Sequence, residues 1–200
     1  MSAATSQKSF EDLYREIQAL PEGSQGEILT PGEIHITMGR PGGPHRRAAQ
    51  QLFRDLDGAD EVSRKGGWWL EVEPEVRFGA RLFDPDMAGW RVANVPVLPE
   101  DNPITILPDW ACEVLSPRTV RTDLTIKLPH YAASGVPFIW IVDPGARLVQ
   151  VYASQASRAV LVATATDEDA VRLPPFDLDV HPARWWLPEE PASPGETAQP

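Results

Sequence analysis

The sequence predicts an α/β sandwich in which helices flank a mixed β-sheet. Its elements run in the order helix, hairpin, helix, three strands, helix and further strands, which is not the regular alternation of a doubly wound fold. At 200 residues the chain is long enough to bury a sizeable core. We expect a single domain over residues 1–187, followed by a disordered, acidic and proline-rich tail over 188–200.

The first third of the chain predicts a helix, a hairpin and a second helix. Ser9 begins a capping box, and apolar residues follow at helical spacing as far as Leu20, before Pro21. Residues 27–29 and 33–38 are predicted to form two short strands around a Thr-Pro-Gly turn. After a Gly/Pro loop, residues 45–56 carry an apolar stripe typical of an amphipathic helix.

The middle of the chain predicts three strands. Residues 69–78 alternate between polar and apolar side chains, which indicates a strand with one wet and one dry face. A Gly-Ala turn leads into residues 82–88, and a proline-rich loop occupies 91–103. Residues 110–115 are apolar except for Glu113, so they predict a buried strand that carries one carboxylate.

A helix is predicted after this strand, beginning near Thr122 or Asp123, both of which are good helix caps. Pro129 is tolerable only near the first turn of that helix, and Gly135 with Pro137 stops it. Residues 138–142, 148–152 and 159–164 then have strand composition.

Composition limits the functional classes. A formal net charge of −11 argues against a surface that coats nucleic acid, although residues 40–54 contain four arginines, one histidine and no acid. Cys112 is the sole cysteine, which excludes a disulfide framework or a cysteine zinc site within one chain. No apolar run reaches the roughly 18 residues of a membrane span, and no apolar signal region is present, so we expect a cytoplasmic protein without a membrane partner.

The candidate chemistry centres on Asp86, Glu113 and Lys127. Adjacent strands lie about 4.8 Å apart, so two carboxylates brought together there repel unless a cation intervenes. Their hard oxygens favour Mg²⁺ or Mn²⁺, and the Lys127 ammonium could stabilise developing charge. The alternative is a structural ion pair between Glu113 and Lys127, with Asp86 in a turn.

Strand parity sorts the neighbouring residues. Cys112 points away from Glu113 and is expected in the core, whereas Asp109 shares the face of Glu113 but lies roughly 13 Å along the strand. Asp84 has the parity of Asp86 and is a rival metal ligand. Ser116 has no evident base nearby, so a capping or loop role is expected.

Several other polar residues have weaker claims. His45 precedes a helix and could reach substrate, although a surface or capping role is favoured. Glu71 and Glu73 are most simply a solvated strand face. Glu27 and Glu75 are candidate auxiliary acids.

A linked set of motifs runs through the chain. It includes Pro108–Pro117, with sequence PDWACEVLSP, and Pro85–Arg91, with sequence PDMAGWR. They are joined by Lys127-Leu128-Pro129, Gly135-Val136-Pro137 and the segment from Trp140 to Pro144. Together these motifs, over roughly residues 26–187, resemble the Uma-two family of restriction endonuclease-like proteins, and the set is specific although no single motif is.

This family is placed in the PD-(D/E)XK nuclease superfamily, and the resemblance implies a restriction endonuclease-like fold with an extra N-terminal helix and hairpin. It implies that Asp86 and Glu113 bind a metal and that Lys127 completes the catalytic set. The superfamily lysine normally stands two residues after the acid, where this chain has Leu115, so the role would be displaced onto the next helix. Glu27 and His45 match family positions that approach the site.

The implied chemistry is hydrolysis of DNA phosphodiester bonds with one or two magnesium ions. The candidate phosphate contacts are Arg46, Arg47, Arg118 and Arg121. A homodimer is expected, because symmetric pairs are the commonest assemblies and duplex cleavage needs two cuts. The alternatives are an inactive nuclease fold used for binding or assembly, and a hydrolase of a smaller phosphate ester.

Overall fold

The computed structural model describes residues 8–38, 42–57 and 67–188. Its core is a six-stranded sheet with the order β10-β9-β8-β7-β6-β3. These strands are β3 (Trp68–Val72), β6 (Met87–Arg91), β7 (Trp110–Val114), β8 (Phe138–Asp143), β9 (Leu148–Gln155) and β10 (Arg158–Ala165). Only β7 and β8 run parallel, so the sheet is mixed, as the sequence predicts.

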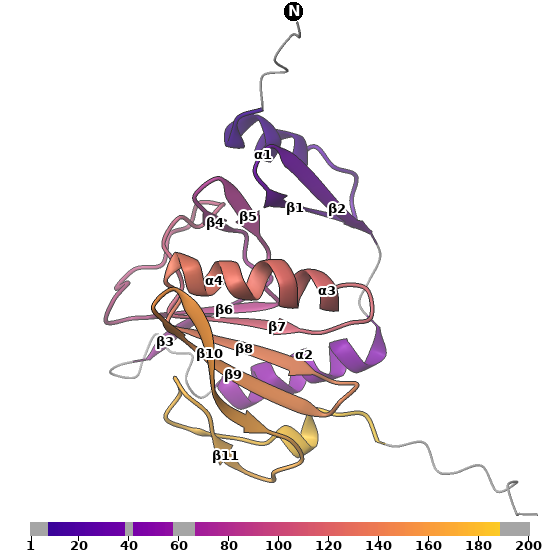
Figure 1. Ribbon diagram of the computed structural model, residues 1–200, viewed down its shortest axis with the longest axis vertical. Coiled ribbons are helices and arrows are strands. Elements are labelled where there is room, and N and C mark those ends of the chain that lie inside the picture. The colour runs from indigo at the N-terminus through magenta and orange to yellow at the C-terminus, as the bar shows by residue number, and fades with distance from the viewer. Residues whose placement is uncertain (1–7, 39–41, 58–66, 189–200) are drawn as a thin grey trace, which may run out of the picture.

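Helices cover both faces of this sheet (Figure 1). One face carries a continuous helical segment made of α3 (Val120–Thr122), the π-helical turn η1 (Asp123–Lys127) and α4 (Leu128–Ser134). The other face carries α2 (Gly43–Leu56), which buries the predicted stripe of Ala48, Leu52 and Leu56. The alternation of β7 follows this division, because Trp110, Cys112 and Val114 pack on the α2 side while Ala111 packs under α4.

The C-terminal part of the described chain closes the α2 side. Short strands β11 (Val171–Arg172) and β12 (Asp179–Val180) pair, and a 3-10 turn η2 (Pro182–Arg184) follows. Asp55 on α2 fixes this segment by accepting hydrogen bonds from the Trp185 ring nitrogen at 2.8 Å and from the His181 amide at 2.6 Å. Residue 188 of the predicted tail is described, and the rest of the tail, 189–200, lies outside the described residues.

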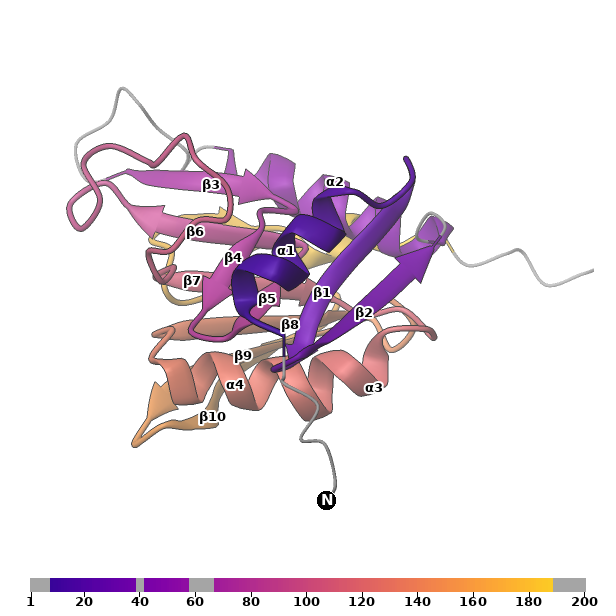
Figure 2. The same cartoon turned by 90° about the horizontal axis from the view of Figure 1, so that it is seen from above.

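The N-terminal elements form a second layer above the central sheet (Figure 2). Strands β1 (Ser24–Thr30) and β2 (Glu33–Met38) make the predicted hairpin, and β5 (Arg81–Phe83) and β4 (Val76–Phe78) extend it in the order β2-β1-β5-β4. Helix α1 (Phe10–Gln18) is capped by the Ser9 side chain and packs on β1. Gly26 permits this close approach, because a Cβ there would lie 2.9 Å from Ile17.

The predicted strand over residues 69–78 is in fact two strands in two different sheets. Glu73 adopts a left-handed backbone conformation (φ 50°) and Pro74 follows it, so β3 ends at Val72 and β4 begins at Val76. Pro85 similarly separates β5 from β6 within the predicted strand 82–88. Five strands therefore occupy the region where the sequence predicted three.

The helix after β7 begins at Val120, two or three residues before the predicted start near Thr122 or Asp123. Asp123 consequently lies inside the helix and is buried at 2% exposure rather than serving as a cap. In η1 the amide of Leu128 donates to the carbonyl of Asp123, five residues back. This wider turn precedes Pro129, where an ordinary α-turn would press the proline ring against the carbonyl of Thr125.

Candidate active site

Glu113 is placed at the carboxyl end of β7 and is almost completely buried, at 2% exposure. The Tyr131 hydroxyl, from α4, donates a 2.6 Å hydrogen bond to Glu113 Oε1. Lys127, from η1, places its Nζ 3.2 Å from the same oxygen. One carboxylate of the central strand is thus held from the helical side by a neutral and a charged donor.

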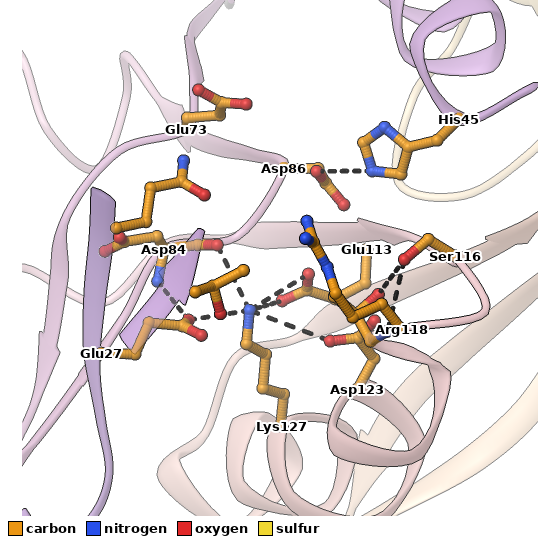
Figure 3. Close-up of a pocket in the computed structure, with 13 residues that line it drawn as sticks. Glu27, His45, Glu73, Asp84, Asp86, Glu113, Ser116, Arg118, Asp123 and Lys127 are labelled. Atoms are coloured by element: carbon orange, nitrogen blue, oxygen red, sulfur yellow. Dashed lines mark hydrogen bonds and ion pairs between the residues drawn. The ribbon is translucent and has the colours of Figure 1, made fainter. Parts of the chain in front are cut away.

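Lys127 gathers carboxylates from three parts of the chain (Figure 3). Its Nζ lies 2.8 Å from Glu27 Oε1 on β1 and 3.9 Å from Asp123 Oδ1 one helical turn earlier, in addition to Glu113. It also donates to the carbonyl of Asp84 at 3.3 Å. The side chain is only 6% exposed, so these partners replace the solvent around its ammonium.

Asp86 lies between the end of β7 and helix α2. Its Oδ2 accepts a 2.7 Å hydrogen bond from the amide of Val114, the residue after Glu113. Its Oδ1 is 2.9 Å from His45 Nε2 in the first turn of α2. His45 is buried at 9% exposure, so the expectation of a surface or capping histidine is wrong.

Burial dominates the electrostatics of these acids. Desolvation raises the pKa of Asp84 to about 8, reinforced by Glu27, and raises the pKa of Asp123 to about 6 against the opposing charge of Lys127. It also raises the pKa of Glu113 well above the usual range. Burial lowers the pKa of Lys127, but the charges of Glu113 and Glu27 outweigh it and the net pKa is raised. The cluster contains more carboxylates than its own cations neutralise.

These residues line one pocket, together with Glu73, Ser116 and Arg118 (Figure 3). Its volume of about 70 Å³ has room for a few waters or an ion. The buried Oδ1 of Asp84 has no hydrogen-bond partner within the described part of the chain. A hard divalent cation suits such a set of oxygen donors with surplus negative charge.

The described residues contain no ready-made cage of three or more His, Cys, Asp or Glu ligands. Asp86 and Glu113 are instead engaged by His45, Tyr131 and Lys127. Mg²⁺ does not need a protein cage, because it commonly binds through one or two carboxylates together with waters and substrate phosphates. The donor set therefore fits a magnesium site that water and substrate complete.

The structure separates the four predicted phosphate contacts. Arg118 lines the acidic pocket and donates to the carbonyl of Met38 on β2. Arg121 is exposed on α3, and Arg46 is exposed on α2. Arg47 donates to the carbonyl of Arg184 at 3.0 Å and does not line the pocket, because it lies about 200° around α2 from His45.

The structure also places four other residues that the sequence singled out. Cys112 is completely buried on the α2 side, as parity predicts. Asp109 accepts hydrogen bonds from the Arg91 amide and the Asn94 side chain, away from the pocket. Ser116 bonds with Thr119 in the loop after β7. Glu75 accepts a hydrogen bond from Tyr14 rather than entering the pocket.

Sequence analysis missed the roles of Asp123 and Tyr131 and gave Asp84 only as a rival to Asp86. Asp123, Lys127 and Tyr131 follow one another at intervals of four residues, which places them on one helix face. This four-residue spacing indicates the shared face once the helix is taken to begin at Val120. At the superfamily's usual lysine position, Leu115 is buried at 7% exposure and packs in the apolar cluster under α4.

Comparisons with known proteins agree with this architecture. The crystal structure of a "putative nuclease belonging to DUF820" from Anabaena variabilis ATCC 29413 matches with a TM-score of 0.66 and 22% sequence identity. The match covers 89% of this chain and 97% of that chain, and shows a shared fold. No curated protein matches the chain. No helix among the described residues has both the length and the apolar character to span a membrane. The Uma2 family model, described as "Putative restriction endonuclease", matches residues 10–181, and the chain therefore belongs to the Uma2 family.

Proposed function

We propose that this protein is a metal-dependent endonuclease that hydrolyses phosphodiester bonds of DNA. The observation that carries the proposal is the surplus of carboxylate around Lys127 at the carboxyl end of β7. A divalent cation bound at this site would balance the negative charge and would serve phosphodiester hydrolysis. Membership of the Uma2 family supports the same chemistry.

Asp86 and Glu113 would hold the cation, from the β5–β6 connection and from β7. The cation would polarise a phosphoryl oxygen and lower the pKa of a coordinated water. Tyr131 orients Glu113, and His45 orients Asp86, through the hydrogen bonds described above. These contacts keep both carboxylates in fixed positions before substrate arrives.

Lys127 would supply positive charge next to the scissile phosphate. In the structure its ammonium is held by Glu27, Glu113 and Asp123, and its long flexible stem can redirect it. Glu27 would act as an auxiliary residue that positions Lys127. Arg118 at the pocket rim is the best-placed arginine for a flanking phosphate.

Cleavage of supercoiled plasmid and of single-stranded DNA, with magnesium, manganese or chelator, tests this function. Asp86→Asn, Glu113→Gln and Lys127→Met should each abolish metal-dependent cleavage while circular dichroism shows a folded protein. Asp167→Asn, a surface carboxylate paired with Arg147, is the matched control and should cleave normally. Absence of cleavage by the wild type would contradict the proposal.

The second candidate is an inactive nuclease fold used for binding or assembly. The observation that favours it is that Lys127 is already paired with the buried carboxylate of Glu113 and the partly buried carboxylate of Glu27, as in a structural ion pair. Calorimetric titration with magnesium discriminates between the two functions. Metal binding that is lost in Asp86→Asn and Glu113→Gln favours the nuclease, whereas no binding by the wild type favours the inactive fold.

A further inference from the structure

A second, apolar pocket adjoins the acidic one at the carboxyl ends of the parallel strands β7 and β8. Its walls include Pro44 at the start of α2, Leu115 and Pro117 after β7, and Pro144 after β8. Its volume is about 450 Å³, within the range of pockets that bury small organic molecules. The acidic pocket, with about 70 Å³, has no room for such a group.

The two pockets share His45 and Ser116. His45 Nε2 contacts Asp86 in the acidic pocket, while the same residue lines the apolar pocket. A phosphate bound beside Asp86 would therefore bring the rest of its nucleotide to the mouth of the apolar pocket. The flat faces of a nucleobase suit walls made of proline rings and aliphatic carbons.

Asp143 adds one polar feature to the apolar pocket. Its Oδ1 accepts hydrogen bonds from the amides of Gly145 at 2.9 Å and Ala146 at 3.0 Å, which fix the carboxylate. Its other oxygen has no protein donor among the described residues and can accept from a base. Guanine presents two adjacent N–H donors on its pairing edge, whereas the single N–H of thymine stands between two carbonyl oxygens that repel a carboxylate.

We propose that the apolar pocket binds the unpaired base of a nucleotide next to the scissile phosphate, with a preference for guanine over thymine. The inference rests on the proposed nuclease function. A base can present its faces and pairing edge to this pocket only when it has left the duplex, so the substrate is single-stranded or locally unpaired DNA. The acidity of the chain supports base burial as a source of affinity, because few cations are available for phosphates.

The test measures fluorescence anisotropy of labelled ten-mers with the full chain, in calcium and in chelator. The ligands are a thymidine ten-mer, the same strand with one central guanine, a fully abasic ten-mer that keeps every phosphate, and the duplex of the guanine strand. We expect the guanine strand to bind most tightly, and the thymidine strand to bind about tenfold more tightly than the duplex or the abasic strand. Equal binding of all four, or no binding of single strands, overturns the proposal.

Two variants assign the binding to this pocket. Val120→Phe, which fills the pocket from α3, should weaken binding of the thymidine strand about tenfold and leave binding of the abasic strand unchanged. Val160→Phe is the matched control, at the opposite end of the sheet from Asp143. Asp143→Asn retains the oxygen that accepts from the Gly145 and Ala146 amides, and should remove the guanine preference alone.

Plasmid cleavage in magnesium, measured on the same proteins, distinguishes failure of the base-pocket proposal from failure of the nuclease proposal. If the protein prefers single strands and Val120→Phe weakens their binding, but no cleavage occurs, the base-pocket proposal stands and the nuclease proposal fails. If the protein cleaves duplex plasmid, binds duplex as well as single strands and is unaffected by Val120→Phe, the nuclease proposal stands and the base-pocket proposal fails.

Discussion

The hydroxyl of Tyr131 donates a 2.6 Å hydrogen bond to Glu113 Oε1 inside the protein, joining helix α4 to the one acidic residue of strand β7. Both side chains are essentially inaccessible, with exposures of 0% and 2%. A buried carboxylate is costly unless donors satisfy it, so this contact is central to how the fold tolerates Glu113.

Tyr131→Phe should therefore destabilise the protein by about 1–3 kcal/mol, because it removes the closer of the two donors to a buried carboxylate oxygen. The Tyr131 hydrogen bond lowers the pKa of Glu113 against the larger effect of burial, so its loss should raise that pKa further. If Glu113 acts as a carboxylate, the acidic limb of the activity profile should move to higher pH. Urea unfolding and a pH–rate profile measure the two effects, and an unmoved profile would contradict the positioning role.

Lys127→Met should destabilise the metal-free protein by about 3–5 kcal/mol, because removing one partner strands the buried carboxylates of Glu113 and Asp123 and the partly buried carboxylate of Glu27. Adding Glu27→Gln to this variant should restore part of the loss. Urea unfolding in chelator measures both variants. A loss below about 1 kcal/mol, the usual range of a surface ion pair, would show that the cluster is not a tightly coupled network.

Asp84→Asn should stabilise the metal-free protein increasingly as pH rises. Burial, then Glu27, raises the pKa of Asp84 to about 8 from an ordinary value of 3.8. Protonated Asp84 contributes its full stability below the pKa of the unfolded chain, about 4. This stability is lost as the pH rises from there through the folded pKa of about 8. Thermal unfolding in chelator at both ends of this window should show the two proteins converging at low pH. A constant difference would contradict the assignment.

His45→Gln should destabilise the protein more at acidic than at alkaline pH. Burial lowers the pKa of His45, but its hydrogen bond and ion pair with Asp86 outweigh burial and raise the net pKa. The added stability is present below the unfolded pKa, about 6.5, and disappears as pH rises through the raised folded value. His35→Gln, at an exposed histidine on β2, is the matched control and should change the stability little. Urea unfolding in chelator, measured across this pH range for both variants, tests the prediction.

The sequence by itself determined most of the helices and strands and the position of the central carboxylate, Glu113. Alternation along residues 110–115 assigns Glu113 and Cys112 to opposite faces, because successive strand side chains point to opposite sides. The capping residue, the apolar stripe of α2 and the stop at Gly135 are likewise local patterns, and the structure contains all three. The breaks at Glu73 and Pro85 were also written in the sequence, but their effect depends on which sheet each strand joins.

Only the tertiary structure decided which charges meet. Glu27 and Lys127 are separated by 100 residues and come together because β1 pairs with β5, whose chain continues through Asp84 toward β6. His45 reaches Asp86 because α2 packs against the face of β7 opposite α4. Periodicity reports which face a side chain takes within its own element, whereas these contacts depend on how separate elements pack, which no local pattern contains.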